Sequence, residues 1–497
     1  MPVSQFNFKD LKQYITSSKD QTLHSLALRH GKKYVGSSSS MTSTLAQFHF
    51  LLSQWRPIDA SSVSRSFSEQ LDTFTIIQRC ASSVFLRYKD GVYALDATKE
   101  FASANVLMSL GKSMEKLLTQ KPDHFERYRK TSEVKVPEEE RTLPEAYQYS
   151  EAGDFLMRAQ LDAWDPRLPG TGTFDLKTRA VASIRHNTRK YEEGQGYEIK
   201  KRFGDWESYE REYFDMIRSA FLKYSLQVRM GQMDGIFVAF HNVDRIFGFQ
   251  YVSLPEMDTA VHGSEDTIIG DQEFRLSIRL LNDILNRITE RFPHRSLRLQ
   301  CETRDALSGH FMYVFAEPMD KSKIDAIQRS RDSVINAFEE SLTNPPQALN
   351  EAEHENLSST AASEANVEKA SDPTSQEPDT AEEAAPTELL ALSVRIQNKL
   401  DGIKVSRPTK MNRSSTWQVE YDVKEIKSPS VAQNAYRSSK LRQKKVLDAN
   451  EELKEYNYYV RRLRELTAKG IAWRKSRDDL DAGRQKVTLY DTTYKAG

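Results

Sequence analysis

An acidic segment near the C-terminal end most constrains how this 497-residue chain can fold. Residues 339–386 contain twelve acidic residues, one lysine and five prolines, and almost no large apolar side chains. Such a segment cannot bury enough apolar surface to offset the entropy lost on ordering, so we expect a disordered acidic linker. The remaining chain is then divided into residues 1–338 and a small C-terminal segment, 387–497.

The composition of the whole chain limits which classes of protein it can belong to. Hydrophobic residues make up 38% and aromatic residues 10%, enough for the core of one large domain or of two to three ordinary ones. The formal net charge is zero, so a nucleic-acid-binding surface must come from local clusters. The two cysteines, Cys80 and Cys301, indicate a reducing or neutral compartment and disfavour a disulfide framework or a cysteine-rich zinc site. No apolar run approaches the length of a membrane span, and the N-terminus lacks a signal-peptide core.

A serine run marks the start of a predicted helix in the N-terminal part, residues 1–83, which we expect to be a helical elaboration. Ser37–Ser40 precede the apolar-periodic run TLAQFHFLLSQW, which ends at Arg56-Pro57. The simpler interpretation is an N-cap with its loop. The alternative is a cluster of hydroxyl groups that contacts phosphate at a helix N-terminus.

The pattern over residues 84–338 is typical of an α/β domain. VFLRYKDGVYAL predicts a hairpin around Asp90-Gly91. Further strands are expected at 155–164, 172–179, 235–241, 245–254, 297–303 and 311–317, with helices at 104–120, 208–230, 272–292 and 322–340. After the linker, 416–426 is a predicted strand. Residues 436–475 form a predicted basic helix with twelve Lys/Arg against five Asp/Glu, either a solvated face or a nucleic-acid or partner contact.

The octapeptide GTFDLKTR, residues 172–179, places an acidic residue and a lysine inside a predicted strand. Side chains alternate along a strand, so Asp175 and Lys177 share one face and Leu176 points to the other layer. Asp162 lies on the preceding strand, joined through a Pro/Gly turn, and an antiparallel pairing would bring its carboxylate beside that of Asp175. Two adjacent carboxylates repel unless a cation lies between them, which favours a hard divalent metal, above all Mg²⁺, with Mn²⁺ as the substitute.

A glutamate on the preceding helix supplies a third candidate carboxylate. Glu115 follows Gly111 by one turn on the same face, and the glycine would let the helix approach the sheet closely. Lys177 would then lie beside the metal, where it could hold a scissile phosphate or depress the pKa of the attacking water. The structural alternative is an ion pair of Asp175 with Lys177 or Arg179 on a partly solvated sheet.

This order resembles the PD-(D/E)XK nuclease superfamily: a helix glutamate, an aspartate at a strand, Asp-x-Lys on the next strand, a long helix and a further strand. The matching residues are Glu115, Asp162, Asp175 and Lys177. The superfamily often adds a polar residue on the helix after the lysine strand, for which Gln227 is the best match and Tyr224 the second. The resemblance implies a nuclease-like core over 84–338, with a central mixed β-sheet flanked by helices.

Longer strings carry a closer resemblance. They are HGKKYVGSSSSMTSTLAQFHFLLSQWRP, LRYKDGVYALDATKEF, LMSLGKSMEKLL, GDFLMRAQLDAWDPRLPGTGTFDLKTRAVASIR, RFGDWESYEREYFDMIRSAFLKYSLQVRMGQMDGIFVAFHN and FGFQYVSLPEMD. Together they resemble the fungal mitochondrial RNA 5′-end processing and degradation proteins, the petite-gene family, over residues 1–320. This resemblance implies a role in mitochondrial RNA processing. Family members carry an N-terminal extension with targeting information, and no such segment is visible at MPVSQFNF, so the expected location in the mitochondrial matrix depends on the resemblance.

The residues and the resemblance together predict a Mg²⁺-dependent 5′-to-3′ exoribonuclease that hydrolyses phosphodiester bonds of mitochondrial transcripts. Glu115, Asp162 and Asp175 would bind the metal, with the Leu176 carbonyl as a candidate extra ligand, and Lys177 would position or activate the attacking water. Arg179, Arg185 and Gln227 are the candidate RNA-binding residues, the arginines because a basic run leaves the lysine strand.

Two alternatives stay open. One is a catalytically inactive RNA-binding activator of a partner exoribonuclease, and the other is a RecB-like DNA nuclease. The candidate partners are mitochondrial RNA, a degradation complex of exoribonuclease and helicase, and the inner membrane through peripheral association.

Overall fold

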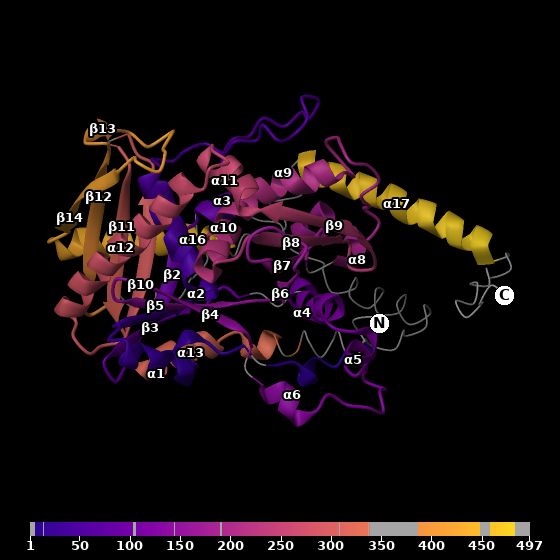
Figure 1. Ribbon diagram of the computed structural model, residues 1–497, viewed down its shortest axis with the longest axis horizontal. Coiled ribbons are helices and arrows are strands. Elements are labelled where there is room, and N and C mark those ends of the chain that lie inside the picture. Colours follow the sequence, from indigo (N-terminus) through magenta and orange to yellow (C-terminus); the bar gives the residue numbers. More distant parts are fainter. Residues whose placement is uncertain are drawn as a thin grey trace, which may run out of the picture.

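Two β-sheets with helices around them form the body of the protein (Figure 1). The computed structural model describes residues 5–12, 14–102, 106–143, 145–188, 191–307, 309–335, 337, 386–447 and 458–482. The predicted acidic linker, apart from Pro386, lies outside the described residues. This arrangement confirms the predicted fold class, an α/β protein with a large mixed sheet flanked by helices.

The larger sheet has ten strands in the order β13-β12-β11-β10-β2-β3-β1-β5-β4, with β14 also paired to β12. Only β1 makes parallel pairs, with β3 and with β5, and the other pairs are antiparallel. The strands are β1 (Tyr34–Ser37), β2 (Ser82–Lys89), β3 (Val92–Ala97), β4 (Tyr147–Ala152), β5 (Phe155–Gln160), β10 (Leu297–Arg304), β11 (Phe311–Pro318), β12 (Leu390–Leu400), β13 (Ile403–Val405) and β14 (Trp417–Glu425). The predicted hairpin is confirmed: β2 and β3 are joined by Asp90 (φ 47°) and Gly91 (φ 86°), the two positive φ angles that a tight hairpin turn requires.

The smaller sheet has four strands in the order β6-β7-β8-β9. They are β6 (Ala163–Trp164), β7 (Thr173–Ala180), β8 (Gly235–His241) and β9 (Ile246–Ser253). β7 and β8 are parallel, and the two outer pairs are antiparallel. The chain passes from the larger sheet to the smaller one between Gln160, the last residue of β5, and Ala163.

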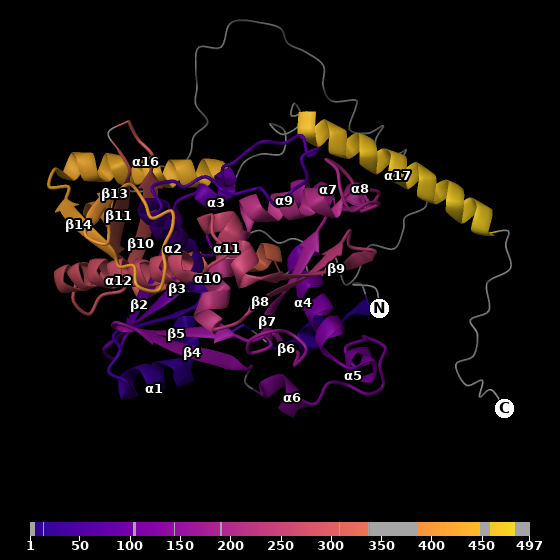
Figure 2. The same cartoon turned by 45° about the horizontal axis from the view of Figure 1, so that its top comes forward.

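Helices cover both faces of the larger sheet (Figures 1 and 2). They are α1 (Gln21–Arg29), α2 (Ser38–Leu52), α3 (Ile76–Arg79), α4 (Val106–Thr119), α5 (Pro122–Glu126), α6 (Glu138–Thr142), α7 (Ala182–His186), α8 (Tyr191–Gly194), α9 (Tyr209–Ser219), α10 (Phe221–Gly231), α11 (Leu254–His262), α12 (Ile268–Arg291), α13 (Lys321–Arg329), α16 (Pro429–Leu447) and α17 (Tyr458–Ala482), with short 3-10 helices at Phe8–Asp10 and Ser17–Lys19. In the described residues, no helix combines the length and the apolar character that crossing a membrane requires.

Helix α2 is the central helix of the core. It packs on β2, β3, β5 and β10 and against α10 and α12, and most of its side chains, polar ones included, are buried. The opposite face of the sheet is covered by α1, whose Leu23 and Ala27 pack on Val35, Val92 and Leu156.

The helix predicted over 208–230 is interrupted. Ala220 has φ −139° and ψ −32°, so the chain forms α9 up to Ser219 and α10 from Phe221. No glycine or proline marks this break. The interruption changes the direction of the chain and allows α10 alone to pack against α2 and β5.

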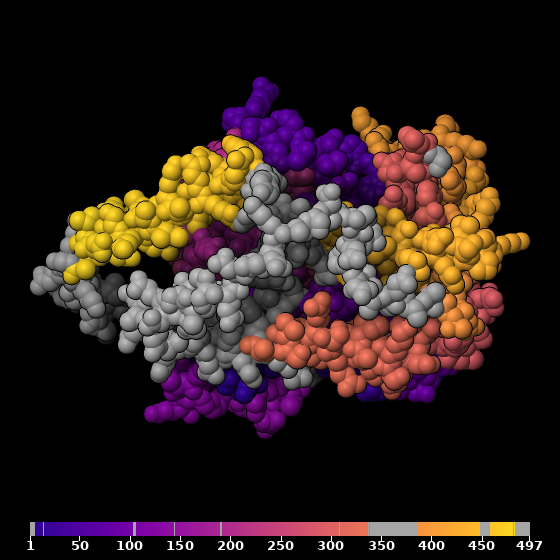
Figure 3. Space-filling model, turned by 180° about the vertical axis from the view of Figure 1, so that it is seen from behind, coloured from indigo at the N-terminus to yellow at the C-terminus, as the bar shows by residue number. Residues whose placement is uncertain are grey.

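The C-terminal segment is joined to the larger sheet. β12 pairs antiparallel with β11, with Val314 opposite Leu392, and α16 packs on the same edge through Ala432 and Tyr436. The expected basic helix over 436–475 is instead two helices, α16 and α17, which lie on different sides of the molecule (Figure 3). Residues 387–447 therefore complete the sheet of the preceding chain.

Candidate active site

Asp162 lies where the chain crosses from one sheet to the other. β6 pairs with β7 so that Ala163 is opposite Phe174, and this register brings the preceding residue, Asp162, beside Asp175. The Leu176 backbone N–H donates a hydrogen bond to Asp162 Oδ2 at 2.9 Å. The antiparallel pairing predicted for these two aspartates is therefore confirmed.

Asp175 and Lys177 form an ion pair on one face of β7. The Lys177 Nζ lies 2.5 Å from Asp175 Oδ2 and 5.2 Å from the centre of the Tyr224 ring on α10. Asp175 is only 6% exposed, so the pair lies mostly out of water, where electrostatic interactions are strong. The ion pair that was the structural alternative thus exists, but it lies inside a pocket and not on a solvated sheet.

The two aspartates differ in their protonation. Burial, together with the hydrogen bond to Asp175 and its charge, raises the pKa of Asp162 to about 8. Burial alone would also raise the pKa of Asp175, but Lys177, the hydrogen bond with Asp162 and Lys223 together lower it. Burial alone would lower the pKa of Lys177, but Asp175, Tyr224 and Asp162 together raise it. A carboxyl group held neutral beside an ionised one is typical of sites where two acids share a cation or a proton.

A pocket of about 240 Å³ opens at this point, and it brings five predicted residues together. Glu115, Asp162, Asp175, Lys177 and Gln227 all line it, together with Leu176. The sequence-based expectation that these residues lie close together in space is met by the structure, while their chemical roles stay proposals.

Glu115 reaches the pocket from α4. A Cβ built on Gly111 would lie 3.4 Å from Thr178 Oγ1 of β7, so the glycine lies in direct contact with the sheet, as predicted. The Glu115 side chain is one-third exposed and lies 3.3 Å from Lys116 Nζ. Gln227 enters from α10, and its Oε1 is buried without a hydrogen-bond partner in the described residues. Both side chains therefore offer oxygen atoms to the pocket.

The serine run forms the cap of α2, as the simpler interpretation predicted. The Ser37 hydroxyl accepts from the Ser40 backbone N–H at 3.3 Å, and the Ser40 hydroxyl accepts from the Ser37 N–H at 2.9 Å, which is a capping box. Ser37, Ser38 and Ser39 also line the pocket. The N-terminus of a buried fifteen-residue helix thus faces the carboxylates, and the phosphate-binding interpretation stays a proposal.

Sequence reasoning missed several residues of the pocket: Tyr14, Tyr147, Arg158, Gln160 and Met233. Arg158 forms an ion pair with Asp20 and lies 4.4 Å from the Tyr147 ring centre. A single arginine inside the apolar run FLMRAQ was the available signal, because a charged side chain in a buried strand needs a partner.

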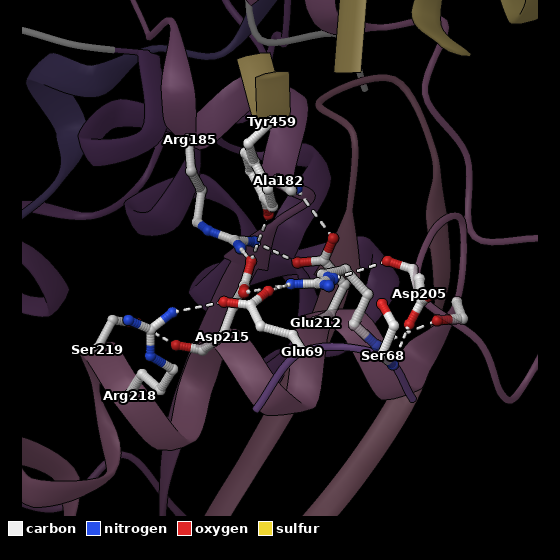
Figure 4. Close-up of polar contacts among 12 residues, drawn as sticks. Ser68, Glu69, Ala182, Arg185, Asp205, Glu212, Asp215, Arg218, Ser219 and Tyr459 are labelled. Carbon is white, nitrogen blue, oxygen red and sulfur yellow. Dashed lines mark hydrogen bonds and ion pairs between the residues drawn. The ribbon is translucent and has the colours of Figure 1, made fainter. Parts of the chain in front are cut away.

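Arg179 and Arg185, the predicted phosphate ligands, are not among the residues that line the pocket. Arg185 forms ion pairs with Glu212 and, at 2.5 Å, with Asp215 Oδ2, and it also donates to the Ala180 carbonyl. Figure 4 shows its guanidinium between these two carboxylates of α9, with Tyr459 of α17 closing the cluster. Arg179 is buried, and burial together with Arg185 lowers its pKa to about 10. This geometry engages the Arg185 guanidinium in buried ion pairs, and the predicted contact of both arginines with RNA stays a prediction.

The fold and the pocket define an α/β protein with a carboxylate–lysine site at the junction of two sheets. The family described as "Mitochondrial protein Pet127" matches residues 14–286, more than half of the chain, and the chain belongs to this family. The family is mitochondrial, which confirms the predicted compartment.

Two curated relatives support the assignment. The "mRNA degradation protein pet127, mitochondrial" of Schizosaccharomyces pombe is 41% identical over 329 residues, which cover 64% of this chain and 62% of the relative. The "Putative mitochondrial translation system component PET127" of Saccharomyces cerevisiae is 38% identical over 356 residues, covering 62% of this chain and 42% of the relative. The chain therefore spans less than two thirds of the length of these relatives.

Among solved structures, Candida albicans Rai1 in complex with pU5 and Mn²⁺ aligns with a TM-score of 0.31 and 10% sequence identity, covering 69% of this chain and 85% of that one. A likeness at this level carries no conclusion about fold or chemistry.

Proposed function

We propose that this protein is a divalent-metal-dependent nuclease with a PD-(D/E)XK-like site, a 5′-to-3′ exoribonuclease that hydrolyses phosphodiester bonds in mitochondrial RNA. One observation carries the proposal: Glu115 of α4, Asp162 between β5 and β6, and Asp175 and Lys177 of β7 all line one pocket. The name of the S. pombe relative, an mRNA degradation protein, supports RNA as the substrate.

The residues of the pocket suit Mg²⁺ or Mn²⁺. Every carboxylate in it is an oxygen donor, as hard cations prefer, and the Gln227 Oε1 is buried without a partner. Asp162 and Asp175 lie close together, and the negative charge of Asp175 contributes to the raised pKa of Asp162. A cation between the two carboxylates would relieve this repulsion. Glu115, Asp162 and Asp175 are the proposed ligands, with the Leu176 carbonyl as an additional one.

The chain's own residues have distinct roles in this proposal. A bound cation would lower the pKa of a coordinated water and polarise the phosphate. Lys177 keeps its proton, because Asp175 raises its pKa, so it holds the scissile phosphate and stabilises the charge that develops on its oxygens. The N–H groups at the start of α2 face the same pocket and could hold a neighbouring phosphate.

The ion pair itself favours a second candidate function, an RNA-binding activator of a partner exoribonuclease. Lys177 Nζ at 2.5 Å already balances the charge of Asp175, as a vestigial site would require. In this case the pocket binds RNA ends, and the chain cleaves nothing.

The deciding experiment is a time course on 5′- and 3′-labelled RNA of one sequence, with and without Mg²⁺, and with single-stranded DNA as competitor. Wild type is compared with Asp175→Asn and with Asp165→Asn, a control on the same hairpin whose carboxylate pairs with Arg167 at the surface. We expect Mg²⁺-dependent loss of the 5′ label in wild type and control only. Full activity in Asp175→Asn would show that the proposed mechanism is wrong. RNA binding without cleavage by wild type would support the activator. A preference for DNA over RNA would support a DNA nuclease.

A further inference from the structure

Two histidines and a glutamate converge in the interior of the molecule, away from the pocket. His49 lies on α2, His262 is the last residue of α11, and Glu273 lies on α12. One nitrogen of each imidazole and one carboxylate oxygen lie within 4.8 Å of one another. The three side chains are at most 4% exposed. Three separate helices therefore bring metal-ligating groups to a single buried point.

Several polar atoms of these three side chains have no hydrogen-bond partner among their protein neighbours. His49 Nδ1 lies 2.5 Å from Glu273 Oε1, but His49 Nε2, His262 Nδ1 and Glu273 Oε2 have no hydrogen-bond partner in the described part of the chain. Buried polar atoms almost always have a partner, because leaving one unpaired costs its full desolvation. Three such atoms in one cluster indicate a ligand that protein atoms alone do not provide.

The spacing suits a cation better than a further hydrogen bond. His262 Nδ1 and Glu273 Oε2 lie 3.9 Å apart, too far for a hydrogen bond. Two atoms bound to one zinc ion at about 2.1 Å are separated by at most about 4.2 Å. The existing separation therefore lies within the span of two ligands of the same ion.

A buried carboxylate lies near the second nitrogen of His262, just beyond hydrogen-bond distance. His262 Nε2 lies 3.8 Å from Asp258 Oδ1, and this carboxylate is fully buried and is held on its other oxygen by Arg229. A carboxylate behind the imidazole fixes the ring and increases its basicity as a ligand.

We propose that His49, His262 and Glu273 form a zinc site that ties α2, α11 and α12 together. Two imidazoles and one carboxylate are a zinc ligand set, and a water would complete four-coordination. His49 lies twelve residues after Ser37, about 18 Å along α2 at 1.5 Å per residue. The site is thus separate from the candidate active site, although the same helix runs from one to the other.

The test measures zinc in the full chain with the carboxylate pocket disabled. The Asp175→Asn protein is stripped with a chelator, and zinc is then titrated back while bound metal and melting temperature are followed. We expect one zinc ion per chain and a higher melting temperature. Cobalt in place of zinc should give the visible absorption of a four-coordinate site. No bound zinc together with an unchanged melting temperature overturns the proposal.

Variants then locate the ion. His262→Gln and Glu273→Gln should each abolish the cobalt absorption, and Asp258→Asn should weaken zinc binding by about 10- to 100-fold. The control is His30→Gln, because His30 and Glu151 form the same kind of pair, also at 2.5 Å, on the surface. Zinc affinity that is unchanged in all three interior variants overturns the proposal. If these variants do not fold, the cobalt spectrum of the Asp175→Asn protein alone decides.

Discussion

The backbone N–H of Leu176 on β7 donates a hydrogen bond to the carboxylate of Asp162, the residue just before β6. It holds Asp162 in place at the crossing from β5 to β6, next to Asp175. Side chains alternate along a strand, so Asp175 and Lys177, on either side of Leu176, share one face of β7 and line the pocket. The backbone of one strand thus positions an acidic group of the other, which is the precondition for any chemistry here.

Lys177→Met should remove cleavage while leaving RNA binding measurable. The substitution keeps most of the volume of the side chain but removes the charge proposed to stabilise the phosphate, an effect worth about 100-fold or more in rate. Single-turnover cleavage of 5′-labelled RNA measures the rate, and a filter-binding assay measures affinity. Lys200→Met, on an exposed lysine paired with Glu207, is the control. A rate within threefold of wild type would show that the proposed role is wrong.

The serine cap and the proposed phosphate contact can be separated by two alanine substitutions. Ser37→Ala removes the side chain that caps α2 and should lower the free energy of unfolding by about 1 kcal/mol. Ser39→Ala leaves the cap intact, so stability should stay near the wild-type value while the affinity for phosphorylated RNA ends falls. Urea denaturation and competition by inorganic phosphate measure the two effects. Equal RNA affinity in Ser39→Ala and wild type would show that the serine run only caps α2 and does not bind phosphate.

Acid should destabilise the protein through His241, the last residue of β8. Burial, with a smaller effect of Arg185, lowers its pKa to about 4 in the folded state, against about 6.5 in the unfolded chain. Between these two pH values His241 is protonated in the unfolded chain but neutral in the folded protein. The free energy of unfolding therefore falls as the pH falls from 6.5 towards 4. The slope is at most about 1.4 kcal/mol per pH unit.

Urea denaturation at pH 7, 6 and 5 measures this slope against a variant that does not titrate. His241→Asn keeps an acceptor for the Val243 N–H, which donates to His241 Nδ1, and should reduce the slope, while the buried His262, whose pKa is also lowered, keeps its own contribution. His30→Asn changes an exposed histidine and should leave the slope unchanged. Identical slopes in wild type and His241→Asn would refute the prediction.

Arg185 should matter for folding and not for RNA contact. Arg185→Met leaves Glu212 and Asp215 without their shared cation in the cluster of Figure 4, and breaking a buried ion pair costs about 3 kcal/mol. Thermal unfolding measures the loss, with Arg202→Met on an exposed arginine as the control. Unchanged stability with weakened RNA binding would instead restore the phosphate-binding role that the sequence suggested.

The sequence predicted the pocket because its main signals are local. The Asp90-Gly91 turn, the shared face of Asp175 and Lys177, and the one-turn spacing of Gly111 and Glu115 follow from chain geometry alone. The ion pairs of Arg185 were not predicted, for the opposite reason. Its partners lie 27 and 30 residues away on α9, and only the tertiary structure turns an apparent basic surface run into a buried ion cluster.

Long-range packing likewise explains the other differences. The break at Ala220 carries no glycine or proline, and after it α10 packs on α2 and β5. The pairing of β12 with β11 joins chain segments on either side of the acidic segment. Neither contact leaves a periodic pattern in the sequence, so hydrophobic spacing predicted the strands but not their place in the sheet.

The docking of α17 gives the last prediction. Tyr459, at its start, donates a hydrogen bond to Asp215 at 3.2 Å, and Gly470, further along, packs directly on Gly196: a Cβ at Gly470 would lie 1.8 Å from the Gly196 carbonyl oxygen. Both contacts are with backbone or buried groups that cannot move away easily. Gly470→Ala should therefore undock the helix even though alanine favours helix formation. In limited digestion, trypsin should then cut at the basic residues of 461–475 earlier than it does in wild type. Lys469→Ala, on the exposed face of the helix, is the control and should not speed cleavage elsewhere in α17. Equal resistance in Gly470→Ala and wild type would show that this contact does not hold the helix.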